Sequence, residues 1–182
     1  METSTRLSDD IVTLRPFHRE DAAPLYEAVC ESLADLRPWM AWAHESYMEA
    51  SAREFVALAR ARWEEGTLFA FAITRADEIV GGCTLSGLNP VNRFCNLGYW
   101  VRSSQHGHGF AGHAAKLAAR FGFEHVGLVR AEIVIAQGNT QSMRVAEKIG
   151  AHYEGKLLNR MVVGSSIYDA HMYSLIPMDF GL

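Results

Sequence analysis

The stretch Gln105-His106-Gly107-His108-Gly109-Phe110-Ala111-Gly112-His113 constrains the fold most, because it joins a strand-like run directly to a helix-like run. Residues 95–101 before it are short, aromatic and β-branched, which is typical of a buried strand. Residues 111–124 after it repeat Ala, Leu and Phe at helical spacing. The two glycines at 107 and 109 leave backbone N–H groups uncovered, and the first helical turn adds free donors and the positive end of a helix dipole. The junction is therefore predicted to bind an anion such as a pyrophosphate.

A Gly-x-Gly turn alone does not settle a function, because it also occurs in tight turns that bind nothing. The dinucleotide-binding fingerprint requires an acidic residue at the end of the following strand. Here the following strand ends at Ala136-Gln137, neither of which is acidic, so the turn does not match that fingerprint. No Gly-Lys-Ser/Thr follows the turn, so it is not a Walker loop. A nucleotide-binding protein that uses the same glycine turn stays open as an alternative, and thermal stabilisation by ATP or NAD rather than CoA would identify it.

Two blocks in order resemble motifs of the GNAT superfamily of N-acetyltransferases. His106 to Ala111 resembles the Gln/Arg-x-x-Gly-x-Gly/Ala motif that holds the pyrophosphate of acetyl-CoA, with His106 where the family usually has Gln or Arg. The block from Asn139 to Ala151 resembles the family's next helix, whose asparagine and small residue line the acyl and thiol end of the cofactor. The resemblance implies acetyl-CoA as cosubstrate and a backbone cradle for its pyrophosphate.

The first quarter of the chain narrows this resemblance to the RimJ/RimL-type branch. Residues 36–42, Leu-Arg-Pro-Trp-Met-Ala-Trp, resemble that branch's Leu-x-Pro-Trp-x-x-Trp signature, and residues 96–101 resemble its strand before the phosphate loop. The implied activity is acetyl transfer to a primary amine, with the N-terminal α-amine of a ribosomal-type protein as the leading acceptor. A small-molecule amine, either a polyamine or an antibiotic, and a non-catalytic acyl-CoA-binding sensor are the alternatives.

The candidate site divides into a cofactor part, a catalytic part and an acceptor part. The predicted cofactor-binding residues are Tyr99, Trp100, Val101, His106, Gly107, His108, Gly109, Phe110, Ala111, Asn139 and Ser142. Ser142 and Asn139 are the catalytic candidates. The predicted acceptor-binding residues are Tyr26, Trp39, Met40, Trp42 and Asp169, although the aromatic members are equally compatible with a core between the first two helices. Tyr99 and Trp100 point to opposite faces of their strand, so at most one faces the acyl group.

Acetyl transfer requires a neutral amine, a stabilised oxyanion and a proton for the leaving thiolate. Many superfamily members supply that proton from a helix tyrosine, but the aligned residue is Ala146, so Ser142 is the replacement that the resemblance suggests. The RimL-type branch that the chain resembles often carries a glutamate at two places, which correspond here to residues 160–161 and to Asn96. Neither place holds a carboxylate. At pH 7.5 roughly a third of an α-amine but only about 0.1% of a lysine amine is neutral. An enzyme without a strong base therefore suits an α-amine.

Composition limits the classes of protein. The 182 residues are 49% hydrophobic and 21% charged, which is typical of one globular domain, here an acetyltransferase domain over 1–182. A net charge of −4 argues against nucleic-acid binding. Three cysteines without Cys-x-x-Cys spacing and the lack of a long apolar run favour a cytoplasmic protein without a membrane segment.

The eight histidines lack partners at metal-ligand spacing, so no metal is expected. Members of the family that the chain resembles are often dimers, so the resemblance implies a homodimer.

The pattern of elements predicts an α/β, α+β mixed fold. Residues 1–10 are polar and predicted to lie outside any element. The predicted strands are 11–16, 69–74, 79–85, 93–101, 130–136, 152–157 and 167–176, and the predicted helices are 22–34, 50–64, 111–124 and 140–148. The order is β-α-α-β-β-β-α-β-α-β-β. It predicts a GNAT-like central mixed, mostly antiparallel twisted sheet flanked by helices.

Overall fold

The computed structural model describes residues 5–182 and contains a single twisted sheet. The strands are β1 (Leu7–Ser8), β2 (Thr13–Pro16), β3 (Phe69–Arg75), β4 (Glu78–Asn89), β5 (Phe94–Val101), β6 (Arg130–Ala136), β7 (His152–Val163) and β8 (Ser166–Leu175). Their order in the sheet is β1-β2-β3-β4-β5-β6-β8-β7. β5 and β6 pair in parallel, and the other neighbouring strands of the described residues pair antiparallel. The predicted fold class is confirmed.

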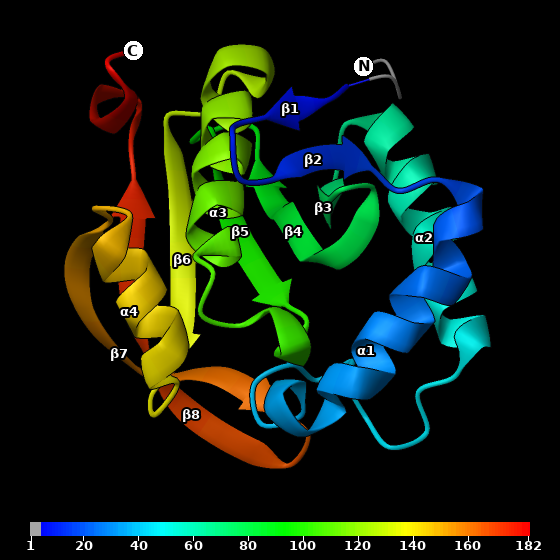
Figure 1. Cartoon of the computed structure of the whole chain (residues 1–182). Helices are drawn as coiled ribbons and strands as arrows, with labels where there is room; N and C mark the ends of the chain where they lie inside the picture. Colours follow the sequence, from blue (N-terminus) through cyan, green and yellow to red (C-terminus); the bar gives the residue numbers. More distant parts are fainter. Residues whose placement is uncertain (1–4) are drawn as a thin grey trace.

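Four helices cover the sheet. They are α1 (Ala22–Leu36), α2 (Glu49–Glu65), α3 (Phe110–Phe121) and α4 (Thr140–Lys148), and Figure 1 shows α1 and α2 on one side with α3 and α4 on the other. The strand β3 divides the core between these two layers. Its Phe69, Phe71 and Ile73 join the cluster that contains α3, whereas Ala70 and Ala72 join the cluster beneath α1 and α2. This alternation follows from the two-residue period of a strand that is buried on both faces.

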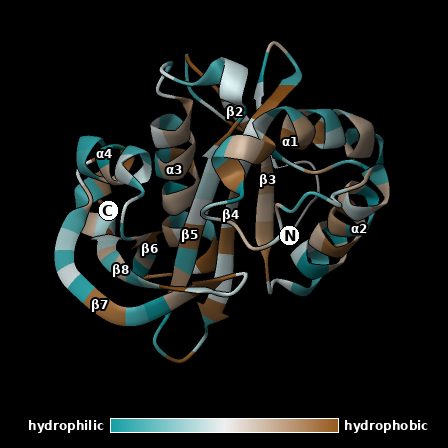
Figure 2. Cartoon of the chain, turned by 90° about the horizontal axis from the view of Figure 1, so that it is seen from below, coloured by the Kyte–Doolittle hydropathy of each residue, from teal (hydrophilic) through white to brown (hydrophobic). Residues whose placement is uncertain are grey.

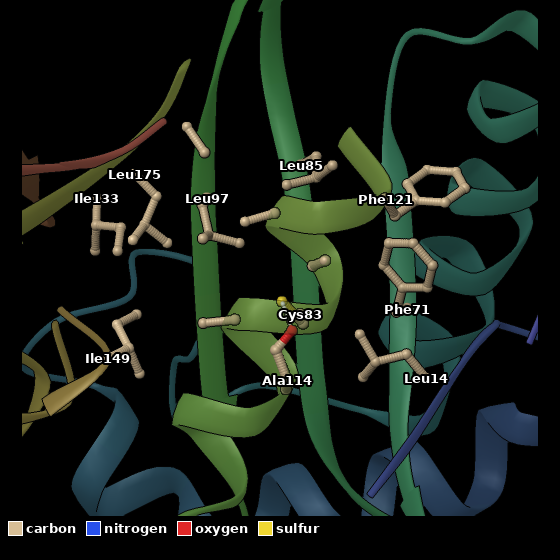
Figure 3. Close-up of a cluster of buried hydrophobic side chains, with 14 of the residues drawn as sticks. Leu14, Phe71, Cys83, Leu85, Leu97, Ala114, Phe121, Ile133, Ile149 and Leu175 are labelled. Atoms are coloured by element: carbon tan, nitrogen blue, oxygen red, sulfur yellow. Dashed lines mark hydrogen bonds between the residues drawn. The ribbon is translucent and has the colours of Figure 1, made fainter. Parts of the chain in front are cut away.

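The sheet packs closely against α3 because the buried face of that helix is made of small residues. Ala114, Ala115, Ala118 and Ala119 are all fully buried. Figure 3 shows Cys83 and Leu85 of β4 beside α3, with Phe121 at its end facing Phe71. Alanine combines the highest helix propensity with the smallest side chain that can be packed against a sheet. The helix therefore lies close over the centre of the sheet, and its first turn is held at the edge of β5.

The parallel pair β5–β6 is the irregular feature of this sheet. The two strands pair from Phe94 to Asn96 on β5 and from Arg130 to Glu132 on β6, and the ladder stops there. Beyond this point β5 continues along β4 and β6 continues along β8. The two strands thus separate toward their carboxyl ends, where α3 and α4 begin. A sheet that opens in this way can accept a ligand between its strands.

Several element boundaries differ from those predicted. The first strand begins at Thr13 rather than Ile11, and Leu7–Ser8 form the short strand β1 against it. The expectation for residues 1–4 lies outside the described residues. The helix predicted to reach residue 124 ends at Phe121, where the chain widens into a π-type turn over Gly122–Val126. A Cβ at Gly122 would lie 3.0 Å from a Leu128 methyl group and 3.1 Å from a Leu85 methyl group, so a side chain there would require these leucines to shift.

Two strands are longer than predicted. β4 extends to Asn89 instead of ending at Leu85, and β7, the first strand of the closing hairpin, extends to Val163 instead of ending at Leu157. The register of β7 against β8 shifts between Leu157 and Met161, and Asn159 within this shift has φ +49°. A register shift interrupts the alternation of inward and outward side chains, which is the signal that marks a strand in a sequence.

Of the described residues, no helix has the length and apolar character that a membrane span requires.

Candidate active site

A cavity of about 490 Å³ opens where β5 and β6 separate. Leu97–Val101 of β5 form one wall, and Ile133–Ala136 of β6 form the other. The glycine loop before α3, the helix α4, the end of α1 with the segment after it, and Met161 of β7 complete it. The cavity therefore collects residues from several separate parts of the chain at the carboxyl ends of the parallel strands, where ligands of open α/β sheets also bind.

The glycine loop has the backbone of an anion cradle. Gly107 has φ +83° and Gly109, which precedes the first residue of α3, has φ +80°, a region that favours glycine. A Cβ at Gly107 would meet no atom within 4 Å, so this side of the loop faces open space. Gly107, Gly109 and Ala111 line the cavity. The free N–H groups at the start of α3 are therefore available to a phosphate group.

The two histidines of the loop have different surroundings. His106 lines the cavity, and its Nε2 lies 3.0 Å from the Val101 carbonyl oxygen. Because a carbonyl only accepts, Nε2 carries the proton and is occupied by the end of β5. His108 is not a lining residue: its ring stacks on Phe110 with 5.3 Å between centroids, and its Nδ1 lies 3.3 Å from the Gln105 carbonyl. His106 therefore stiffens the loop, while His108 covers its outer side.

The start of α4 brings two hydroxyl groups together. Asn139 caps this helix, because its Oδ1 accepts from the Ser142 backbone N–H at 3.1 Å. The Ser142 Oγ donates to the Tyr99 hydroxyl at 3.3 Å, and that hydroxyl donates to the Ser142 carbonyl at 3.2 Å. Burial raises the pKa of Tyr99 to about 12, so its proton is retained at any working pH. Both Tyr99 and Ser142 line the cavity. The pairing of these residues was not predicted.

The predicted acceptor residues separate into two groups. Trp39 and Met40 line the cavity, and the Trp39 ring lies 6.2 Å from that of Tyr168 on the closing hairpin. Tyr26 and Trp42 are not lining residues, because each packs on Tyr47, with ring centroids 6.3 and 6.2 Å away. These two rings belong to the packing between α1 and the segment before α2. Trp100 also packs on Trp42, with 6.1 Å between centroids, although it borders the cavity.

Asp169, which was predicted to bind the acceptor, is not among the residues that line the cavity. Its carboxylate is 2.7 Å from Lys156 Nζ and accepts from the Asn159 backbone N–H at 3.0 Å. The bond from Lys156 keeps the pKa of Asp169 below its ordinary value. Both partners lie on β7, Lys156 just before its register shift and Asn159 within it. Asp169 therefore holds the irregular part of the β7–β8 hairpin, and does so because it lies opposite residues whose regular pairing is interrupted.

Sequence reasoning missed several residues that border the cavity. Arg144 and Lys148 of α4 line it, and their spacing of four residues places both on one face of that helix. This spacing was visible in the sequence. Asp35, near the end of α1, is the one carboxylate among the described lining residues, and nothing in its local sequence indicated the position. Within residues 5–182 no group of three His, Cys, Asp or Glu side chains could hold a metal ion.

The sequence profile of the acetyltransferase (GNAT) domain matches residues 12–152, so the chain belongs to the GNAT acetyltransferase family. It is 24% identical over 174 residues to the ribosomal-protein-serine acetyltransferase of Escherichia coli (strain K12), covering 96% of this chain and 97% of the relative. It is also 24% identical over 159 residues to the spermidine N(1)-acetyltransferase of the same strain, covering 87% and 82%. The structure of Mycobacterium smegmatis RimJ in complex with CoA-disulfide superimposes with a TM-score of 0.85 at 25% identity, covering 98% of this chain and 88% of that one.

The cradle can be tested with two glycines that share a backbone conformation. We expect Gly109→Glu to abolish CoA binding, because it would strain the cradle at a positive φ and add a negative charge beside the pyrophosphate. Gly127 ends the turn after α3, has φ +76° and is not among the cavity-lining residues, so Gly127→Glu carries the same strain at a distance. Calorimetric titration with CoA measures the difference. Equal CoA affinity in folded Gly109→Glu and wild-type protein would remove the loop from the site.

Proposed function

We propose that the chain transfers the acetyl group of acetyl-CoA to a primary amine, and that the acceptor is the N-terminal α-amine of a ribosomal-type protein. The observation that carries this proposal is the continuity of the site: the glycine cradle opens directly into the cavity between β5 and β6, where the hydroxyls of Ser142 and Tyr99 lie. The diphosphate end of the cosubstrate fits the cradle, and Arg144 and Lys148 place two cations along the same cavity. The thioester end fits the gap between the strands.

The reaction forms a C–N bond, breaks a C–S bond and moves one proton from the amine and one to the departing sulfur. Ser142 is proposed to turn its hydroxyl proton from Tyr99 to the sulfur and to take a proton back from solvent, which also receives the proton that leaves the amine. Tyr99, which donates to the Ser142 carbonyl, orients it. Tyr173 of β8 is less suited to this role. It is 2% exposed, donates to Glu147 at 3.3 Å and is not a cavity-lining residue.

The acceptor assignment rests on the acids that border the cavity. Asp35 is the only described lining carboxylate, and it accepts from the Ser103 hydroxyl at 2.5 Å. The cavity thus offers one described lining carboxylate, and one of its two oxygens is already held by the turn before the cradle. An α-amine, of which roughly a third is neutral at pH 7.5, needs less assistance than an alkylamine with a pKa near 10.4. The ribosomal-protein relative supports this acceptor, and the spermidine relative supplies the competing one.

An acceptor comparison tests the function. With acetyl-CoA, we expect thiol release with peptides that begin in Ser or Ala to exceed that with spermidine at least about tenfold in kcat/KM. The same peptides with a blocked N-terminus and one free lysine serve as controls and should give no release. The rate with the free α-amine should rise with pH and level off above its pKa of about 8. Faster turnover of spermidine would replace the peptide assignment, and CoA binding without any turnover would favour a sensor.

The role of Ser142 can be separated from a structural one. The helix cap uses the Ser142 backbone N–H and not its hydroxyl, so Ser142→Ala keeps the cap. The change should lower stability by only about 0.5–1.5 kcal/mol, the net value of a hydrogen bond. If Ser142 donates the proton, kcat should fall about 100-fold with CoA affinity retained. Thr140→Ala, in the same turn but not lining the cavity, is the control. A kcat near that of the wild type would exclude Ser142 and transfer the role to Tyr99.

We also propose a homodimer that forms through the closing hairpin. β7 is one of the two edge strands of the sheet, and Leu158, Val162 and Ile167 are 74%, 64% and 64% exposed on the hairpin that it forms with β8. Figure 2 shows the hydrophobic bands of β7 along the outer edge of the molecule. Exposed edge strands with apolar side chains associate readily. Sedimentation at micromolar concentration should give a dimer, and Val162→Lys should weaken it. A wild-type monomer would overturn the proposal.

A further inference from the structure

The end of α1 is attached to the turn that leads into the glycine cradle. That turn, Ser103–Gln105, follows β5 and precedes His106. The Ser104 backbone N–H donates to Glu31 Oε1 at 2.9 Å, and the Ser103 backbone N–H donates to Ser32 Oγ at 3.0 Å. The Ser103 hydroxyl donates to Asp35 Oδ2. Three side chains of one helix thus contact two successive residues that lie about 70 positions further along the chain.

The geometry of these contacts is specific. Ser32 is fully buried, and its hydroxyl donates to the Ala28 carbonyl at 2.7 Å, which directs an oxygen lone pair at the Ser103 N–H. Glu31 makes a further bond, because Arg102 Nε donates to its Oε2 at 2.6 Å. The bonds from Ser104 and Arg102 lower the pKa of Glu31 to about 2. Glu31 is therefore an anion at any working pH, and hydrogen bonds to an anion are stronger than neutral ones.

Two carboxylates so close to an anion cradle would, on charge alone, weaken the binding of a pyrophosphate. Both oxygens of Glu31 and one oxygen of Asp35 already accept from Arg102 and from the turn that follows it, so these contacts organise the loop. The turn itself continues into the cradle: the His106 N–H donates to the Ser103 carbonyl at 3.3 Å, and Gly107 follows. A displacement of Ser103 and Ser104 is thereby transmitted to the cradle.

We propose that Glu31, Ser32 and Asp35 are positioning residues that hold the Ser103–Gln105 turn, and through it the glycine cradle, in the conformation that binds a pyrophosphate. The inference rests on the proposed use of acetyl-CoA and goes beyond it, because it assigns part of the cofactor affinity to a helix of the opposite layer. The same helix ends just before Trp39 and Met40, which line the acceptor side of the cavity. One rigid element thus fixes the distance between the acceptor wall and the phosphate loop.

A donor that lacks the pyrophosphate isolates this role. We expect Glu31→Ala to raise the KM and the calorimetric Kd for acetyl-CoA about tenfold, because a charged acceptor of the loop is lost. The kcat/KM for acetyl-pantetheine, which has no pyrophosphate, should stay within about twofold of the wild-type value. Glu31→Gln keeps an oxygen for the Ser104 N–H and should restore part of the affinity. Asp35→Ala, which removes the acceptor of the Ser103 hydroxyl, is a second variant and should act in the same direction.

The control is Glu49→Ala, which removes an exposed ion pair with Arg53 on α2. It should leave the kcat/KM values for acetyl-CoA and for acetyl-pantetheine unchanged. Equal losses with acetyl-CoA and acetyl-pantetheine would show a general distortion and overturn the proposal. Unchanged or tighter CoA binding in Glu31→Ala would also overturn it, since tighter binding means that charge repulsion dominates. If the wild-type protein turns over no amine, the proposed function fails, but CoA titration of Glu31→Ala still decides the positioning role. If the wild-type protein binds no CoA, both fail.

Discussion

The parallel ladder between β5 and β6 stops after Asn96 and Glu132, and the rest of the site depends on this interruption. A regular sheet would leave no space between the two strands, whose spacing in a ladder is about 4.8 Å. Because each strand keeps its other neighbour, the opening does not cost the sheet its remaining pairs. The parallel arrangement itself needs a crossover, and α3 supplies it. The same crossover places a helix N-terminus at the mouth of the gap.

The two faces of the sheet then have separate tasks. On one face, the small buried residues of α3 let it approach β4 and β5, and a Cβ at Gly112 would lie 3.0 Å from Ile149, which closes the space toward the end of α4. On the other face, α1 and α2 cover the strands and bring Trp39 and Met40 to the cavity. The bonds that Glu31 and Ser32 accept from the Ser104 and Ser103 backbone N–H groups join the two faces around the end of β5. The cavity is thus bounded by both layers.

The local parts of this structure could be predicted from the sequence, because their signals are local. The periodic Ala, Leu and Phe of α3, the glycines before it and the Asn139 cap of α4 each depend on neighbours a few residues away. The extension of β7 past Leu157 could not, because Asn159 and the register shift remove the alternation. The position of Asp169 could not be predicted for the same reason, because the pairing of β7 with β8 determines that Lys156 is its partner. Asp35 and Glu31 act on residues about 70 positions away, and no local pattern reports such a contact.

The chemistry of the site is asymmetric in its proton carriers. For the departing sulfur there are two adjacent hydroxyls, and burial keeps that of Tyr99 protonated. For the attacking amine there is no unengaged carboxylate among the described lining residues, since Asp35 accepts from Ser103. A site with a proton donor but no strong base discriminates among amines by their own pKa, because only the neutral fraction can attack. The proposed preference for an α-amine over an alkylamine rests on this asymmetry, and the shape of the wall formed by Trp39 and Met40 would then have only to distinguish one α-amine from another.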